Sequence, residues 1–168
     1  MVCRRLSWWI TEQEKPEIFW RSATSGAKAT QDARQGHKVK QGGDLISIDP
    51  AGHWLVEAFS IECKNRHDYG NLDLTMEREG EWLKWWDQCC EDADRASKQP
   101  LMIFQRFRRP AMIAHLYDQH SPGGWTGVME VPQWHIVLQM TTSYRVMISP
   151  FEEWMATNPA DLIQDWCQ

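Results

Sequence analysis

The sequence lacks any long apolar segment, and this limits the environment expected for the chain. No stretch approaches the roughly 20 apolar residues that a membrane-spanning helix needs. The first segment, MVCRRLSWWITEQEK, has no apolar region of the signal-peptide kind. We therefore expect a soluble, cytoplasmic protein with no membrane partner.

Several motifs of metal and nucleotide chemistry are also missing. The five cysteines form no C-x-x-C pair, and the six histidines form no H-x-x-x-H or H-N-H arrangement. Zinc sites and His-metal nuclease sites are therefore not expected, and the odd set of thiols fits reduced cysteines in a cytosolic protein. No G-x-x-x-x-G-K-[ST] motif is present, so we expect no nucleotide cofactor.

Positive charge is in deficit, since the net charge is −5. Such a chain is not expected to bind a polyanion over its whole surface, so any nucleic-acid contact must be local. Two stretches do gather cationic side chains: Lys28, Arg34, His37, Lys38 and Lys40 in the first, and Arg106, Arg108 and Arg109 in the second. Each stretch alone fits ordinary solvated loops as well as a phosphate-binding patch.

Length and composition predict one globular domain over residues 1–168. The 168 residues suffice for a core, and 42% hydrophobic and 24% charged residues are near globular averages. The unusual feature is tryptophan, with eleven copies. Trp82, Trp85 and Trp86 follow helical spacing, which favours packing in the core over a base-stacking platform.

Periodicity and turn residues predict an α/β fold with a mixed sheet and a helix packed on it. In the first half we expect a helix at 2–14, a strand at 17–23, a polar loop at 24–43, and a hairpin of strands 44–49 and 53–64. In the second half we expect a helix at 77–98, a strand at 101–107, an antiparallel pair at 133–140 and 143–149, and one or two helices at 150–166.

The hairpin would bring two acids and an amine together. Glu62 and Lys64 are two apart on a strand and share a face, and the hairpin places Asp44 beside Glu62. Neighbouring carboxylates repel, and Mg²⁺ relieves this because it prefers oxygen ligands. The backbone carbonyl of Cys63 would add a third oxygen, and Lys64 would orient or deprotonate a water. The alternative is a surface Glu-x-Lys ion pair, worth about 0–1 kcal/mol.

Four segments in order carry a family resemblance: FWRSATSGAKAT, GGDLISIDPAG, FSIECKN and WWDQCCEDADRASKQPLMIFQRFRRP. Over about residues 18–110, the chain resembles the PD-(D/E)xK nuclease superfamily, and most closely Holliday junction resolvases of the archaeal type and their phage-borne relatives. The resemblance implies a restriction-endonuclease-like mixed sheet flanked by helices. The core would span about 17–110, with a C-terminal extension at about 111–168.

The resemblance also implies roles for individual residues. Asp44 and Glu62 would bind Mg²⁺ or Mn²⁺, and Lys64 would assist hydrolysis. Ser25, with Gly26, matches a loop that reaches the cleaved strand, and Gln88 matches a polar position directed at the site. DNA contacts are predicted for the basic residues Arg21, Lys28, Arg34, Lys38, Lys40, Arg106, Arg108 and Arg109.

One departure concerns the first helix, where such resolvases place a further metal-site glutamate. Here only Met1 to Arg5 precede Leu6, and none of these residues is acidic. Three alternatives stay open: Glu12, Glu14 or Glu17 substitutes, the site has two carboxylates, or activity is impaired.

The resulting hypothesis is a metal-dependent endodeoxyribonuclease acting on branched DNA as a homodimer, in the host cytoplasm if a phage encodes it. An exposed tryptophan-rich patch would supply the dimer interface. The alternatives are a non-catalytic DNA-binding accessory on a nuclease scaffold and a general or repair endonuclease on linear duplex.

Overall fold

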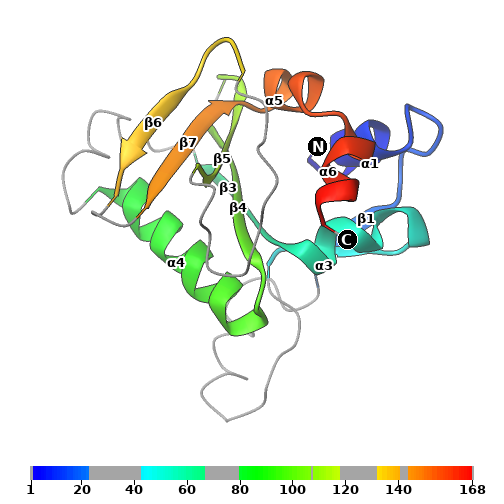
Figure 1. Cartoon of the computed structure of the whole chain (residues 1–168), viewed down its shortest axis with the longest axis horizontal. Helices are drawn as coiled ribbons and strands as arrows, with labels where there is room; N and C mark the ends of the chain where they lie inside the picture. Colours follow the sequence, from blue (N-terminus) through cyan, green and yellow to red (C-terminus); the bar gives the residue numbers. More distant parts are fainter. Residues whose placement is uncertain are drawn as a thin grey trace.

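The computed structural model describes residues 2–22, 43–66, 80–106, 108–117, 132–140 and 144–167 (Figure 1). The elements of the first half are α1 (Val2–Ile10), β1 (Phe19–Arg21), β2 (Leu45–Ser47), η1 (Pro50–Gly52), α3 (His53–Ala58) and β3 (Phe59–Arg66). Those of the second half are α4 (Glu81–Ala96), β4 (Gln99–Arg106), β5 (Ala111–Leu116), β6 (Ile136–Gln139), β7 (Arg145–Pro150), α5 (Phe151–Thr157) and α6 (Ala160–Trp166).

A five-stranded mixed sheet of order β3-β4-β5-β7-β6 forms the centre. Strands β3 and β4 run parallel and are joined by the crossover helix α4, whereas the remaining neighbours are antiparallel. Helix α4 lies on one side of the sheet, and α1, α3, α5 and α6 gather on the other (Figure 1). The predicted fold class, a mixed sheet flanked by helices, is confirmed.

The sheet divides the core into two clusters. On β4, Leu101 and Ile103 join the cluster beneath α1, α3 and α5, whereas Met102 and Phe104 join the cluster beneath α4. This alternation is the period of two expected of a strand covered on both faces. The indoles of Trp82 and Trp86 stack in the α4 cluster with centroids 6.0 Å apart, so the prediction of core packing is confirmed for both.

Helix α1 is fixed to the last part of the chain by one tryptophan. The Trp9 indole Nε1 donates to the carbonyl oxygens of Met155, at 3.1 Å, and Asn158, at 3.0 Å. Its ring centroid is 5.3 Å from that of Trp154. The N-terminal helix therefore depends on α5 and the turn after it for its position.

The predicted hairpin of residues 44–49 and 53–64 is wrong. Strand β2 pairs with β1 instead, and His53–Ala58 forms the helix α3. Asp49 caps a 3-10 turn that has Pro50 in its first position, and this turn leads directly into α3. Leu55 is then fully buried, so core packing outweighs the strand preference of the neighbouring tryptophan and valine.

Other boundaries differ less. Helix α1 ends at Ile10 rather than residue 14, because Glu12 and Gln13 adopt positive φ. Helix α4 begins at Glu81, and residues 77–79 lie outside the described part. Strand β5 was not predicted, although it occupies the middle of the sheet between β4 and β7. The pair β6 and β7 and the two terminal helices are confirmed.

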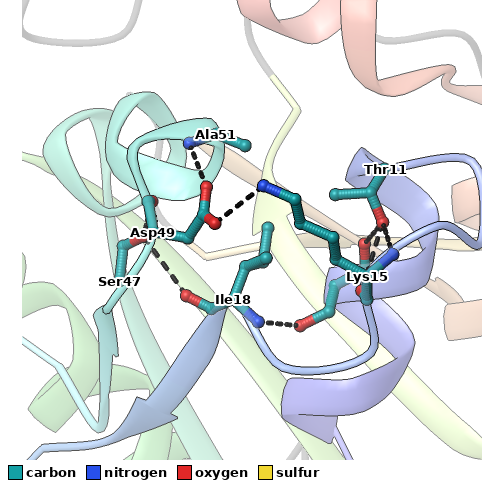
Figure 2. Close-up of polar contacts among 7 residues, drawn as sticks. Thr11, Lys15, Ile18, Ser47, Asp49 and Ala51 are labelled. Carbon is teal, nitrogen blue, oxygen red and sulfur yellow. Dashed lines mark hydrogen bonds and ion pairs between the residues drawn. The ribbon is translucent and has the colours of Figure 1, made fainter.

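A polar clamp joins the segment before β1 to the turn after β2 (Figure 2). Asp49 accepts from Lys15 Nζ and from the Ala51 N–H, each at 2.9 Å. These two donors lower the pKa of the Asp49 carboxyl, with Lys15 contributing more. The Ser47 hydroxyl donates to the Ile18 carbonyl at 3.3 Å, so β1 and β2 are held together beyond their short ladder.

Within the described part, no helix is long and apolar enough to cross a membrane.

Buried His115 should make the fold sensitive to acid. Burial lowers its pKa to about 4, and a weaker opposing effect comes from its bond to the Leu116 carbonyl. Below pH 6.5, His115 is protonated in the unfolded chain but stays neutral in the folded protein. The free energy of unfolding therefore falls as pH falls towards 4. Between pH 6.5 and 5 this loss is about 2 kcal/mol, and urea unfolding at both pH values should show it.

His115→Leu should remove that part of the pH dependence. The matched control is His53→Leu, because His53 is exposed at the start of α3. Equal pH dependence in the wild type and His115→Leu would contradict the assignment.

Candidate active site

Asp44 joins the two sheets at the edge of β3. Its N–H donates to the Ile61 carbonyl, and its own carbonyl accepts from the Ser22 N–H, both at 2.7 Å. Its carboxylate Oδ2 accepts from the Cys63 N–H at 2.9 Å. The side chain is thus fixed against the backbone of β3, and a carboxylate has a second oxygen with which to bind a cation.

Gly43 allows this close approach. Its φ is +90°, a conformation that residues with a Cβ rarely adopt. A Cβ at this position would lie 2.6 Å from the Ile61 nitrogen and 2.7 Å from its oxygen, both backbone atoms that cannot move aside. Residue 43 must therefore be glycine for Asp44 to reach β3.

Glu62 and Lys64 project from β3 towards α4. Lys64 Nζ lies 2.6 Å from Glu62 Oε1 and donates to Gln88 Oε1 at 3.0 Å. The Glu62 side chain is only 8% exposed and that of Lys64 is 19% exposed. These three predicted residues are therefore in contact, and the alternative of a solvated surface ion pair does not describe them.

The charged form of Glu62 is disfavoured at this site. Burial raises the pKa of its carboxyl, Lys64 opposes this, and the negative charge of Asp44 raises the pKa further. Asp44 and Glu62 are thus close enough to repel each other. The neighbouring residue Cys63 has a thiol whose pKa burial raises strongly, so its side chain is a neutral thiol at neutral pH.

These donors fit a hard divalent cation. Carboxylate oxygens and a backbone carbonyl are the ligands that Mg²⁺ and Mn²⁺ prefer, and a cation would offset the Asp44–Glu62 repulsion. Across the described ranges, no group of three or more His, Cys, Asp or Glu is arranged to hold a metal ion. Glu12, Glu14 and Glu17 therefore do not complete such a group with Asp44 and Glu62. Glu17 instead lies 3.9 Å from Arg4.

Asp92 was not among the residues expected at the site. It lies one helical turn after Gln88 on α4, accepts a hydrogen bond from that side chain, and its charge acts on both Glu62 and Lys64. Burial raises its pKa, although Arg95 partly offsets this. The i, i+4 spacing of Gln88 and Asp92 was the signal that could have revealed it.

The arginines of the second basic stretch lie at the same end of the sheet as Lys64. Arg106 is paired in register with Arg66, two residues beyond Lys64 on β3, and Arg108 and Arg109 are exposed in the following turn. Arg21 is exposed at the end of β1. The remaining predicted contacts, Ser25, Lys28, Arg34, His37, Lys38 and Lys40, lie outside the described residues.

A comparison with protein families identifies the family of the chain. A family model described as "phage putative PDDEXK endonuclease" matches residues 2–164. The chain belongs to this family. No curated protein and no solved structure gave a significant match.

Membership of the PDDEXK family confirms the superfamily resemblance and makes the protein a nuclease of phage type. PD-(D/E)xK nucleases generally use divalent metals, and an endonuclease binds DNA. Glu62-Cys63-Lys64 has the E-x-K form of the family's name, whereas the residue before Asp44 is glycine rather than proline. The geometry of Gly43 explains this difference, because its φ of +90° is closed to proline.

Gly43→Ala should destabilise the protein. The added methyl group meets the Ile61 backbone and the left-handed φ is strained, so we expect a loss of about 1–3 kcal/mol in the free energy of unfolding. Urea unfolding measures this loss. A wild-type unfolding curve would show that residue 43 tolerates a side chain.

Glu62→Gln should raise the melting temperature at pH 7.5 in EDTA. The ionised carboxylate is costly there because its pKa is raised, and a glutamine oxygen at position 62 can still accept from Lys64. Above the raised pKa of Glu62, the folded wild type bears the electrostatic cost of the ionised carboxylate. Below about pH 4.5 the carboxyl is protonated in both the folded and the unfolded state, so this cost vanishes. The difference in Tm between variant and wild type should therefore shrink as pH falls. A lower Tm for Glu62→Gln at pH 7.5 would refute this account.

Proposed function

We propose that this nuclease is a divalent-metal-dependent endodeoxyribonuclease that selects branched DNA and works as a homodimer. The observation that carries the metal-dependent part is the joint position of Asp44, Glu62 and Lys64 around one short segment of β3. Resemblance to Holliday junction resolvases supports the branched substrate. Resolving a four-way junction takes two symmetric cuts, which a two-fold dimer supplies.

In this proposal, the metal is held by Asp44, Glu62 and the backbone carbonyl of Cys63. When bound, Mg²⁺ or Mn²⁺ lowers the pKa of a water and stabilises negative charge on the phosphate. The fixed Asp44 carboxylate sets one ligand position, because its Oδ2 is tied to the Cys63 N–H. Glu62 supplies the second carboxylate from the α4 side of the strand.

Lys64 acts on the attacking water or on the charge that develops on the phosphate. Its ammonium group is held by Glu62 and Gln88, which limits its rotamers before substrate arrives. Gln88 acts through Lys64 as a positioning residue. The nucleophilic water forms a bond to phosphorus as the bond to the leaving 3′ oxygen breaks, giving 5′-phosphate and 3′-hydroxyl ends as the family resemblance implies.

Arginines at the carboxyl ends of β3 and β4 would contact phosphates. Arg108 and Arg109 project from an exposed turn that register places beyond Lys64. Local contacts of this kind suit a chain with a net charge of −5. The predicted contacts of Arg21, Arg34, Lys28, Lys38 and Lys40 and the loop role of Ser25 belong to the same proposal.

A second candidate is a DNA-binding accessory without catalysis. The observation that favours it is that, in the described ranges, no third His, Cys, Asp or Glu is placed to hold a metal ion together with Asp44 and Glu62. Calorimetry separates the two candidates, because a metal-dependent nuclease binds Mn²⁺ and an accessory with a defunct site does not. A general endonuclease would also bind the metal, so it is distinguished instead by cleavage of linear duplex.

Metal-dependent nicking of a four-way junction tests the proposal. Labelled junction, matched linear duplex and single strands are incubated with Mg²⁺, Mn²⁺ or EDTA and resolved on denaturing gels. Symmetric cuts confined to the junction are expected. Asp44→Asn and Glu62→Gln should lower the rate at least about 100-fold, and Lys64→Ala by about 100-fold or more.

The matched control is Glu153→Gln, which removes an exposed carboxylate on α5. It should cleave at the wild-type rate. Cleavage of every substrate would replace junction selectivity with general nuclease activity. Firm junction binding with no cleavage in any metal would leave the accessory function.

A further inference from the structure

A groove of about 510 Å³ lies between α1 and β1. Its size falls in the range of about 300–1,000 Å³ typical of pockets for small organic ligands, the size class of a nucleotide. The lining includes residues of α1, of the turn before β1, and of β1 itself: Cys3, Arg4, Arg5, Trp8, Glu17, Trp20 and Arg21.

Two tryptophans in this groove are exposed, unlike those of the core. Trp8 is 41% exposed and Trp20 is 59% exposed, whereas Trp82, Trp86 and Trp154 are buried. A partly exposed indole offers flat apolar surface to a ligand. Two such faces in one groove form a platform on which planar groups can stack.

Cationic side chains surround these indoles. The Arg4 guanidinium carbon lies 5.9 Å from the Trp8 ring centroid, and Arg21 is exposed beside Trp20. Arg5 pairs with Glu152 at 2.8 Å, and the ion pair of Arg4 and Glu17 is long, at 3.9 Å, and exposed. The groove therefore combines aromatic faces with positive charge, which is complementary to bases joined by phosphates.

The groove adjoins the candidate active site. Arg21 pairs in register with Leu45, the residue after Asp44, and Ser22 donates to the Asp44 carbonyl at 2.7 Å. Cys3 in the groove is within electrostatic reach of both Arg21 and Cys63. A strand whose phosphate reached Asp44 and Glu62 would thus have its neighbouring nucleotides at the groove.

We propose that this groove binds unpaired nucleotides next to the scissile phosphate, with bases stacked on Trp8 and Trp20 and phosphates contacted by Arg4 and Arg21. In a duplex, base faces are covered by their neighbours, so only unpaired or splayed nucleotides can use the indoles. The inference rests on the proposed nuclease function and narrows its substrate to DNA with single-stranded nucleotides beside the cut.

The test measures binding of a fluorescein-labelled oligothymidylate by anisotropy, in EDTA and in a Glu62→Gln background so that no cleavage occurs. Trp8→Ala and Trp20→Ala should each weaken binding about 5- to 150-fold, the loss of one stacked base. Trp20→Phe should retain most of the affinity, because a phenyl ring still stacks. Arg21→Gln should weaken binding and reduce its salt dependence.

Trp134→Ala is the matched control, since Trp134 is 48% exposed but precedes β6 at the opposite edge of the sheet. It should bind oligothymidylate like the parent. Unchanged affinity in both Trp8→Ala and Trp20→Ala, or equal losses in Trp134→Ala, would overturn the groove assignment. So would sedimentation showing a dimer that Trp20→Ala dissociates, because the indoles would then serve a protein interface.

Failure of this inference differs from failure of the proposed function. If the wild type nicks a junction with Mg²⁺ but the groove variants bind oligothymidylate with unchanged affinity, the groove assignment alone is overturned. Groove variants that lose oligothymidylate binding support the groove even if no metal supports cleavage by the wild type.

Discussion

The contact on which the site depends is the close approach of the Gly43-Asp44 backbone to β3. Strands β1 and β2 form a separate two-stranded sheet, and the bonds of Asp44 to Ser22 and Ile61 connect it to the central one. The left-handed Gly43 makes that approach sterically permissible. One backbone junction therefore sets the position of the first acid relative to the second, and the polar clamp at Asp49 holds the small sheet in place around it.

The second acid, Glu62, is positioned by the packing of α4 on β3 rather than by a backbone junction. Glu62 lies on the α4 face of β3 with its side chain only 8% exposed, so its charge is costly and depends on Lys64. The Trp82–Trp86 stack fixes α4, and α4 brings Gln88 to Lys64. The charge of buried Glu62 beside Asp44 reduces stability, and a divalent cation would offset their repulsion, which is the usual conflict between stability and activity at a functional site.

The sequence predicted which residues of the candidate site lie together better than it predicted the local structure that brings them there. Glu62 and Lys64 share a face because strand periodicity requires it, and the helical spacing of Trp82 and Trp86 located the α4 core. Asp44 was expected beside Glu62 through a hairpin that does not exist. The proximity is real, but it arises from long-range pairing of β1 with β2 and from the Gly43 turn.

The remaining differences have similar causes. The α3 segment contains strand-favouring residues, and only burial of Leu55 in a core assembled from distant elements makes it helical. Strand β5 follows Pro110 as a short apolar run, too brief for periodicity to distinguish it. The i, i+4 spacing places Asp92 next to Gln88 on α4, but its proximity to Glu62 depends on the packing of α4 against β3.

The anchoring of Trp9 has a consequence for the order in which the molecule is assembled. Its two acceptors lie 146 and 149 residues further along the chain. Helix α1 leads into the polar clamp and β1, and Ser22 after β1 bonds to Asp44, so the Trp9 bonds that hold α1 in place can form only once residues 155–158 have been synthesised. Contacts of such long sequence separation carry a large loop-closure entropy cost, which slows folding. The position of Asp44 in the candidate site therefore depends on a contact between two segments far apart in the chain, and this contact waits for the later segment to be made.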